Sequence, residues 1–206
     1  MTSISSSRPH VAVFDFDGTL TKRDTFIDFI MRTRGKSAVA LAFARAMPWL
    51  VKWKIGLGSG GQTKEKIFGY LYRGVSADEF ARMSREFVRQ INRNLNNSAM
   101  ECLDRHLSKG HSVYIVSASL EPWVSAWARE YDGRIKVIAT LPEVDSRGNL
   151  TGKFNGKNVR GSEKVARLSA ALPRRSEYFM EAYGDSAGDI QMLAFADVAH
   201  KVKGSE

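Results

Sequence analysis

The chain has 206 residues, of which 43% are hydrophobic, so it can bury one substantial core and at most a small second unit. Its single cysteine, Cys102, excludes a disulfide framework within the chain and a zinc site built from four cysteines. A net charge of +9 suits an anionic partner, but the basic residues form no long run, so we do not expect nucleic acid binding.

The N-terminal segment, residues 1–10, is polar and rich in serine. It contains no apolar run that could form the core of a secretion signal. We expect this segment to be a disordered lead-in. We also expect a cytoplasmic protein, with a peripheral location at the inner membrane as the alternative.

The first predicted strand is Val11–Phe14, a short apolar run that ends at the polar sequence Asp15-Phe-Asp-Gly-Thr. From Asp24 to about Arg93, apolar residues recur with helical spacing. This change of period predicts a helical insert directly after the first strand.

Within the insert, Ala38–Leu57 is nearly long enough to span a membrane, but it contains Pro48 and three basic residues. An apolar helical hairpin, or an amphipathic segment at a membrane surface, fits these charges and the two tryptophans, Trp49 and Trp53. The glycine-rich stretch Gly56–Gly61 is predicted to be a flexible turn.

Beyond the insert, Ser98 and Glu101 predict a capping box at the start of a helix that ends at Gly110. Strands and helices then alternate toward the C-terminus. The predicted elements are strand Ser112–Val116, helix Glu121–Tyr131, strand Ile135–Ala139, a hairpin over Val144–Phe154, helix Ser162–Ala171 and strand Tyr178–Tyr183. This order predicts an α/β fold with a largely parallel sheet.

Three of the predicted strands end in polar clusters. These clusters are Asp15 with Asp17, Ser117 with Ser119, and Asp185 with Asp189. Because the carboxyl ends of parallel strands meet at one edge of a sheet, we expect the clusters to share a site.

A divalent cation is the expected occupant of this site. Asp15 and Asp17, spaced by two in an extended segment, point to one side and repel each other unless a positive charge compensates them. Mg²⁺ prefers carboxylate oxygens, water and a substrate phosphate, so we expect Asp15, Asp17 and Asp185 to bind it. Turn formation is the alternative role for any one of these aspartates.

Four segments in order carry a family resemblance. They are the run Asp15-Phe-Asp-Gly-Thr-Leu-Thr, the serine Ser117 that ends a strand, the run Gly161-Ser-Glu-Lys-Val, and the run Gly184-Asp-Ser-Ala-Gly-Asp. Together they resemble the motifs of the haloacid dehalogenase superfamily, and in particular its phosphoserine phosphatase-like subfamily IB. The resemblance implies a Rossmann-like three-layer core, residues 1–21 and 95–206, and an inserted helical cap of the C1 type, residues 22–94.

The resemblance also implies a role for each matched residue. Asp15 matches the nucleophile that forms an aspartyl-phosphate intermediate, and Asp17 the general acid and base, which is typical of the phosphatases of the superfamily. Ser117 matches the hydroxyl that binds a phosphoryl oxygen. Lys164 matches the lysine that holds nucleophile and phosphate together. Asp185 matches the metal ligand of the last motif.

Other matched positions have more than one possible role. Asp189 matches the acid that positions the metal's water and the lysine, with a helix N-cap role as the alternative. Asp24, Thr19 and Ser119 are the predicted substrate contacts. Asp24 lies where phosphoserine phosphatases carry a glutamate, and helix capping is the alternative for both Asp24 and Ser119.

The substrate is expected to be a phosphorylated small metabolite or a lipid phosphate. The stretch Met47–Lys54, apolar with tryptophan and lysine, resembles caps of phosphatidylglycerophosphatase-type relatives, which implies a lipid phosphate and a peripheral membrane contact through the cap. The same helical spacing also fits a cap that only packs its own core.

The leading hypothesis is therefore an Mg²⁺-dependent phosphomonoester hydrolase. A phosphotransferase or mutase that uses the same aspartyl phosphate differs only in the acceptor that reaches the intermediate. A phosphate- or lipid-binding protein without turnover is a third hypothesis. The sequence indicates neither the oligomeric state nor the substrate.

Overall fold

A computed structural model describes residues 8–202, and residues 1–7 of the predicted lead-in lie outside that range. The core is a five-stranded sheet in the order β3-β2-β1-β6-β7, and all its pairings are parallel. Its strands are β1 (His10–Phe14), β2 (Ser112–Leu120), β3 (Lys136–Thr140), β6 (Phe179–Gly184) and β7 (Val198–Lys201). The predicted α/β fold with a parallel sheet is confirmed.

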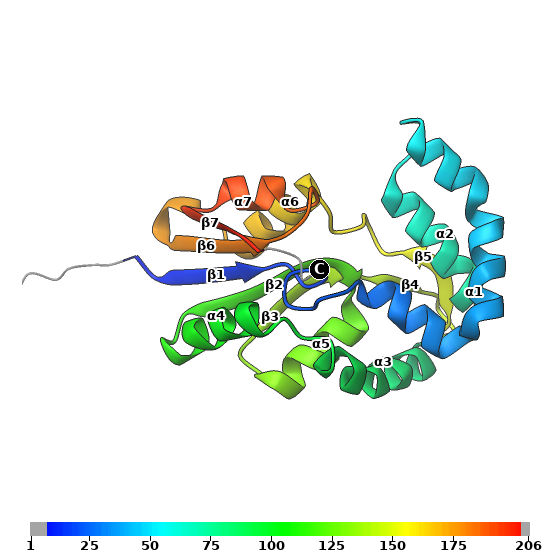
Figure 1. Ribbon diagram of the computed structural model, residues 1–206, viewed down its shortest axis with the longest axis horizontal. Helices are drawn as coiled ribbons and strands as arrows, with labels where there is room; N and C mark the ends of the chain where they lie inside the picture. The colour runs from blue at the N-terminus through cyan, green and yellow to red at the C-terminus, as the bar shows by residue number, and fades with distance from the viewer. Residues whose placement is uncertain (1–7, 203–206) are drawn as a thin grey trace, which may run out of the picture.

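Helices cover both faces of the sheet, because its central strands are apolar on both sides. In β1, Ala12 and Phe14 pack into the cluster that contains α4 (Asn97–Ser108) and α5 (Glu121–Tyr131). Val11 and Val13 of the same strand point to the opposite face, against α6 (Ser162–Ala171) and α7 (Ile190–Phe195). Figure 1 shows these three layers, with α6 and α7 above the sheet and α4 and α5 below it.

The segment predicted to be a helical insert forms α1 (Thr25–Lys54), α2 (Gly60–Tyr72) and α3 (Ala77–Asn92). Helix α1 bends at Gly35, whose φ of 78° leaves the helical region. Aromatic rings join these helices to the core, since Phe29 of α1 stacks on Trp123 of α5 with ring centroids 4.5 Å apart. No helix within residues 8–202 is both long enough and apolar enough to cross a membrane.

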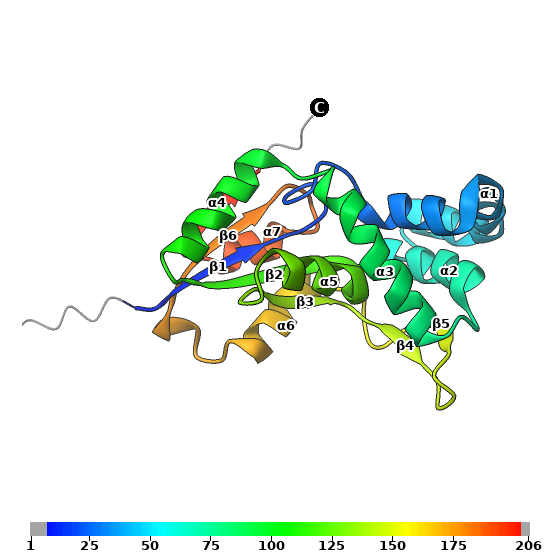
Figure 2. The same cartoon turned by 90° about the horizontal axis from the view of Figure 1, so that it is seen from below.

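The predicted hairpin is confirmed as β4 (Pro142–Val144) and β5 (Leu150–Phe154), which pair antiparallel. It packs against α2 rather than against the parallel sheet, as Figure 2 shows. The backbones meet at two glycines, because a Cβ on Gly69 would lie 2.8 Å from the carbonyl oxygen of Gly152. Phe154 reinforces the contact against Phe68, with ring centroids 5.5 Å apart.

Two predicted boundaries differ from the structure. The capping box at Ser98 is wrong, since α4 already begins at Asn97 and the Ser98 hydroxyl donates to the Asn96 side chain at 3.0 Å. The Asn96 backbone N–H bonds the carbonyl of Leu20 at 2.9 Å, which fixes the helix start two residues earlier than the local sequence suggests. Strand β2 runs on to Leu120 because pairing with β3 continues past Ser117.

Candidate active site

The site lies at the carboxyl ends of β1, β2 and β6. Asp15 follows β1, Ser117 lies near the end of β2, and Asp185 follows β6. All three line one cavity of about 630 Å³ between the sheet and the α1–α2 helices. The predicted convergence of strand ends is therefore present in the structure.

Lys164 is the buried centre of the site. Its Nζ donates to Oδ1 of Asp15 and to Oδ1 of Asp189, both at 2.6 Å. The lysine comes from α6, which begins after Gly161, a residue with a positive φ of 62°. Burial lowers the pKa of Lys164, but the two carboxylates outweigh it and raise the pKa above its usual value, so the ammonium stays charged.

Three carboxylates face each other in this region. Oxygens of Asp15, Asp185 and Asp189 lie within 4.8 Å of one another. Burial raises the pKa of Asp15 to about 7 even though Lys164 lies beside it, and burial also raises the pKa of Asp185. One lysine therefore compensates only part of the negative charge, and this oxygen-rich donor set fits a hard divalent cation.

The loop after Asp15 shapes this cluster. Thr19 donates its hydroxyl to Oδ1 of Asp185 at 2.9 Å, so it orients a carboxylate rather than facing the cavity. Gly18 has a φ of 80°, and a Cβ on it would meet the carboxylate of Asp185. The close approach of β1 and β6 loops therefore requires glycine at this position.

Replacing Gly18 with alanine should displace Asp185 and lower kcat by about 10²-fold, the effect of moving a reacting or binding group by roughly 1 Å. Gly148 is the matched control, since it has the same φ of 80° but no atom within 4 Å of an added Cβ. Steady-state kinetics of the two alanine variants should show the loss only at position 18. Equal losses would show that backbone strain, and not the position of Asp185, is responsible.

Asp17 is held differently from Asp15. Its Oδ1 accepts from the backbone N–H of Thr25 at 2.9 Å and from the Thr25 hydroxyl at 2.6 Å, while Oδ2 accepts from the hydroxyl of Ser119. The Asp17 carboxylate is therefore outside the three-carboxylate cluster. Burial, followed by the charge of Asp24, raises its pKa, which suits a group that donates a proton.

The two serines in the last part of β2 have different surroundings. Ser117 lines the cavity, and its Oγ accepts from the backbone N–H of Ser119 at 3.0 Å. Ser119 is fully buried and does not cap α5, whose N-cap is Leu120. Instead its hydroxyl orients Asp17, as a positioning contact rather than a substrate contact.

Asp189 and Asp24 both stand at helix starts. Asp189 precedes α7, but its side chain does not cap that helix. Its carboxylate accepts hydrogen bonds from Lys164 and from the backbone N–H and hydroxyl of Ser186. Burial raises the pKa of Asp189, but Lys164 outweighs that effect and lowers the pKa below its usual value. Asp24 is the N-cap of α1 and accepts from the N–H of Ile27 at 3.1 Å. Asp24 also lines the cavity.

Lys64 is a cavity residue that sequence reasoning missed. It lies on α2, and its Nζ donates to the carbonyl of Ala118 at 3.0 Å and stands 4.6 Å from the ring centre of Phe26. Burial lowers its pKa, and Asp24 and Asp17 oppose that effect. A lysine in a helical pattern normally faces solvent, so only the tertiary fold, which places α2 over the C-terminal end of β2, could reveal it.

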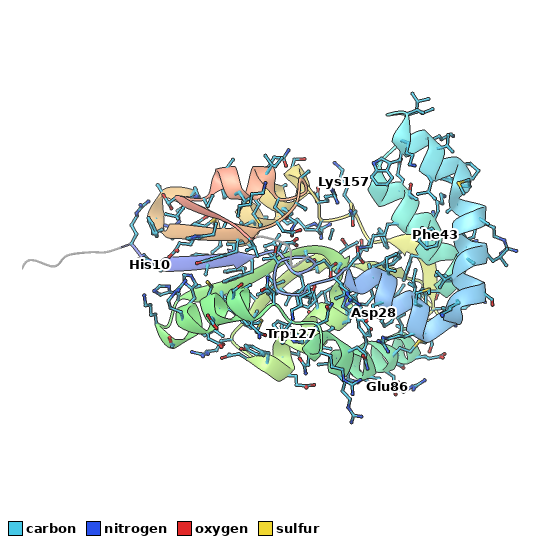
Figure 3. The ribbon with its side chains drawn as sticks, in the orientation of Figure 1. His10, Asp28, Phe43, Glu86, Trp127 and Lys157 are labelled. Atoms are coloured by element: carbon cyan, nitrogen blue, oxygen red, sulfur yellow. The ribbon has the colours of Figure 1, made fainter. Side chains whose placement is uncertain are left out.

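The cavity is lined by both charged and apolar side chains. Arg160 and Asn158, also missed from the sequence, join Lys64 near the carboxylates. Apolar residues of α1 and α2 also line the cavity, among them Phe43, Leu50, Trp53 and Ile67. Figure 3 shows Phe43 on the side of α1 that faces the sheet.

The family model of the haloacid dehalogenase-like hydrolases matches residues 12–194, which is most of the chain. The chain belongs to this family. All of the side chains described above, from Asp15 to Asp189, fall within the matched range.

Relatives of this haloacid dehalogenase-like hydrolase support the same placement. The protein CicA of Caulobacter vibrioides is 29% identical over 96% of this chain and 87% of its own length. A protein of unknown function from Bordetella pertussis Tohama I has a similar structure, with a TM-score of 0.77 and 27% identity over 94% of this chain and 89% of that chain. A substrate-bound phosphoserine phosphatase shares the fold, with a TM-score of 0.64 and 20% identity over 95% of this chain and 85% of that chain.

Proposed function

We propose that this hydrolase is an Mg²⁺-dependent phosphatase that hydrolyses a phosphomonoester through an aspartyl phosphate on Asp15. The observation that carries the proposal is the bond from the buried Lys164 to Asp15 at 2.6 Å, beside Asp185 and below an open cavity. A carboxylate held in this way can approach a phosphoryl group, because positive charge next to it reduces the repulsion between the two anions.

In the first step, a carboxylate oxygen of Asp15 attacks phosphorus while the bond from phosphorus to the leaving oxygen breaks. Asp17 gives its proton to the leaving alcohol, for which its raised pKa suits it. In the second step, the Asp17 carboxylate takes a proton from water, the water oxygen bonds to phosphorus, and Asp15 leaves as the free carboxylate. Ser117 and Lys164 would donate hydrogen bonds to phosphoryl oxygens throughout.

Asp15 and Asp185 are the carboxylates that would hold the cation, which would supply charge neutralisation for the phosphoryl oxygens. The sequence prediction included the Asp17 carboxylate among the ligands. Because that carboxylate lies outside the cluster of Asp15, Asp185 and Asp189, we assign it to proton transfer instead. Asp189, bonded to Lys164 and Ser186, would orient the lysine.

For the substrate we propose a phosphomonoester with an apolar portion, in which a lipid phosphate is favoured over a small polar metabolite. The apolar side chains of Phe43, Leu50, Trp53 and Ile67 support this choice, because they line the same cavity as the carboxylates. We further propose that α1–α3, residues 22–94, act as the cap over the site, together with the hairpin that packs on α2.

Phosphate release from a panel of phosphomonoesters tests the proposal. The panel contains phosphoserine, sugar phosphates, lysophosphatidate and phosphatidylglycerophosphate, each assayed with Mg²⁺ and with excess EDTA. We expect release that depends on Mg²⁺ and is at least tenfold faster with the substrates that carry an acyl chain. Full activity in EDTA would contradict the metal assignment, and equal rates across the panel would contradict the apolar substrate.

The same assay separates hydrolysis from transfer. If an acceptor alcohol other than water reached the intermediate efficiently, added glycerol would yield glycerol phosphate in place of inorganic phosphate. We expect inorganic phosphate to remain the main product. A complete lack of phosphate release from every member of the panel would favour the hypothesis of a binding protein without turnover.

A further inference from the structure

The turn between α1 and α2 carries an exposed apolar surface. Met47 and Val51 of α1 are 53% and 49% exposed, and Ile55 and Leu57 in the turn are 62% and 75% exposed. Exposed lysines, Lys52 and Lys54, lie among them. We call these six residues the α1–α2 tip, and Figure 1 shows this turn projecting away from the sheet at the top of the helix pair.

The charge around the α1–α2 tip has one sign. Residues 29–64 contain seven lysines and arginines and no aspartate or glutamate. Within the part of the chain that the structure describes, neither Lys52 nor Lys54 has a carboxylate within salt-bridge distance, whereas Arg32, farther back on α1, is paired with Asp28 at 2.8 Å. The tip therefore presents apolar side chains together with uncompensated positive charge.

The α1–α2 tip is continuous with the mouth of the active-site cavity. Trp53, between Lys52 and Lys54, is 48% exposed and also lines the cavity. Leu50, one residue before Val51, lines the cavity as well. The same turn of helix thus contributes to the outer surface with some side chains and to the cavity wall with others.

We propose that the α1–α2 tip docks on an anionic lipid bilayer. Apolar side chains of this size gain free energy when they enter the boundary between headgroups and acyl chains, and each nearby lysine adds attraction to anionic headgroups. Tryptophan suits this boundary because its ring is apolar and its N–H is polar. A bilayer fits better than an acidic protein groove, because the turn projects away from the sheet and presents exposed apolar side chains together with lysines.

Docking in this way would bring the cavity mouth close to the lipid surface, so the inference deepens the proposed function and rests on it for its catalytic meaning. The binding itself does not require turnover. The Asp15→Asn variant should therefore bind vesicles as the unmodified protein does. Failure of catalysis and failure of docking can be told apart by this variant.

Vesicle co-sedimentation tests the docking directly. The full chain is mixed with phosphatidylcholine vesicles, with or without phosphatidylglycerol, at low and at high salt. We expect binding to the vesicles that contain phosphatidylglycerol to be at least tenfold tighter than to pure phosphatidylcholine and to weaken as salt is added.

Two variants examine the two components of the α1–α2 tip. Lys52→Gln with Lys54→Gln should weaken binding to the anionic vesicles by about tenfold or more, and Val51→Glu with Ile55→Glu should abolish it. The matched controls on the core are Lys109→Gln and Val198→Glu, both at exposed positions, which should bind normally. Far-UV circular dichroism and activity on a water-soluble phosphomonoester show whether each variant is folded.

Four outcomes would overturn the proposal. One is equal binding to neutral and anionic vesicles, and another is no binding to either. The third is a concentration-dependent dimer, detected by sedimentation velocity, that Val51→Glu with Ile55→Glu abolishes, since a second copy of the chain would then be what covers the tip. Normal vesicle binding by the Val51 and Ile55 variant would also contradict it.

Discussion

Replacing Asp15 with asparagine is expected to abolish turnover, with a loss in kcat on the order of 10³-fold or more. Asparagine keeps the shape of the side chain and can still accept from Lys164, but its amide oxygen is too weak a nucleophile to form the acyl phosphate. Single-turnover phosphate release measures the loss. Trapping of a phosphorylated chain from the unmodified protein, and none from the variant, would locate the intermediate.

Asp78→Asn is the control for this change. Asp78 is an exposed aspartate in the first turn of α3, and removing its charge should leave kcat within about twofold of the unmodified value. Normal activity in the Asp15→Asn protein, once deamidation back to aspartate has been excluded by mass spectrometry, would refute the nucleophile assignment.

Replacing Lys164 with methionine should remove activity and also destabilise the fold by about 3–5 kcal/mol, because it leaves buried carboxylates without their partner. The loss of stability should be largest in EDTA at neutral pH. It should become smaller as pH falls, because protonation of Asp15 or Asp189 removes one of the facing negative charges. In this pH range the folded variant binds more protons than the unfolded chain, so its free energy of unfolding rises as pH falls. Urea denaturation at several pH values measures the free energy of unfolding.

The exposed ion pair of Arg82 and Glu86 gives the comparison. Its atoms are 2.7 Å apart, but the side chains are 57% and 64% exposed, so Arg82→Met should change the free energy of unfolding by no more than about 0.5 kcal/mol. Adding Asp189→Asn to Lys164→Met should recover part of the lost stability. If Lys164→Met and Arg82→Met proved equally mild, the electrostatic account of the buried site would fail.

The parts of the fold that follow from local pattern could be predicted from the sequence. Val11–Phe14 is a strand because its residues are apolar on both faces, and Glu121–Tyr131 is a helix with proline in the first turn. The placement of Asp15 and Asp185 together follows from one rule, that parallel strands end at one edge. Lys164 was named only through resemblance, since nothing in a helical pattern marks a lysine as buried.

The parts that depend on distant segments could not be predicted in this way. Lys64 reaches the carbonyl of Ala118 only because α2 folds over the C-terminal end of β2. Ser119 was predicted to be a helix cap or a substrate contact. Its hydroxyl instead donates a hydrogen bond to Asp17, which is far away in the sequence. The predicted start of α4 was wrong for the same reason, because the hydrogen bond from the Asn96 backbone N–H to the carbonyl of Leu20 fixes where the helix begins. No local propensity encodes these contacts.

The packing of the β4–β5 hairpin on α2 has a consequence for how this chain could be rebuilt. The polypeptide crosses between the sheet and the helical insert after β1 and after α3, and again on either side of the hairpin. Deleting residues 22–94 would therefore remove the apolar side chains that pack against Leu150 and Phe154. A homologous cap could be transplanted onto this sheet only together with its own hairpin, with glycines at the positions where the two backbones touch. Substrate preference should therefore be determined by two separate stretches of the sequence.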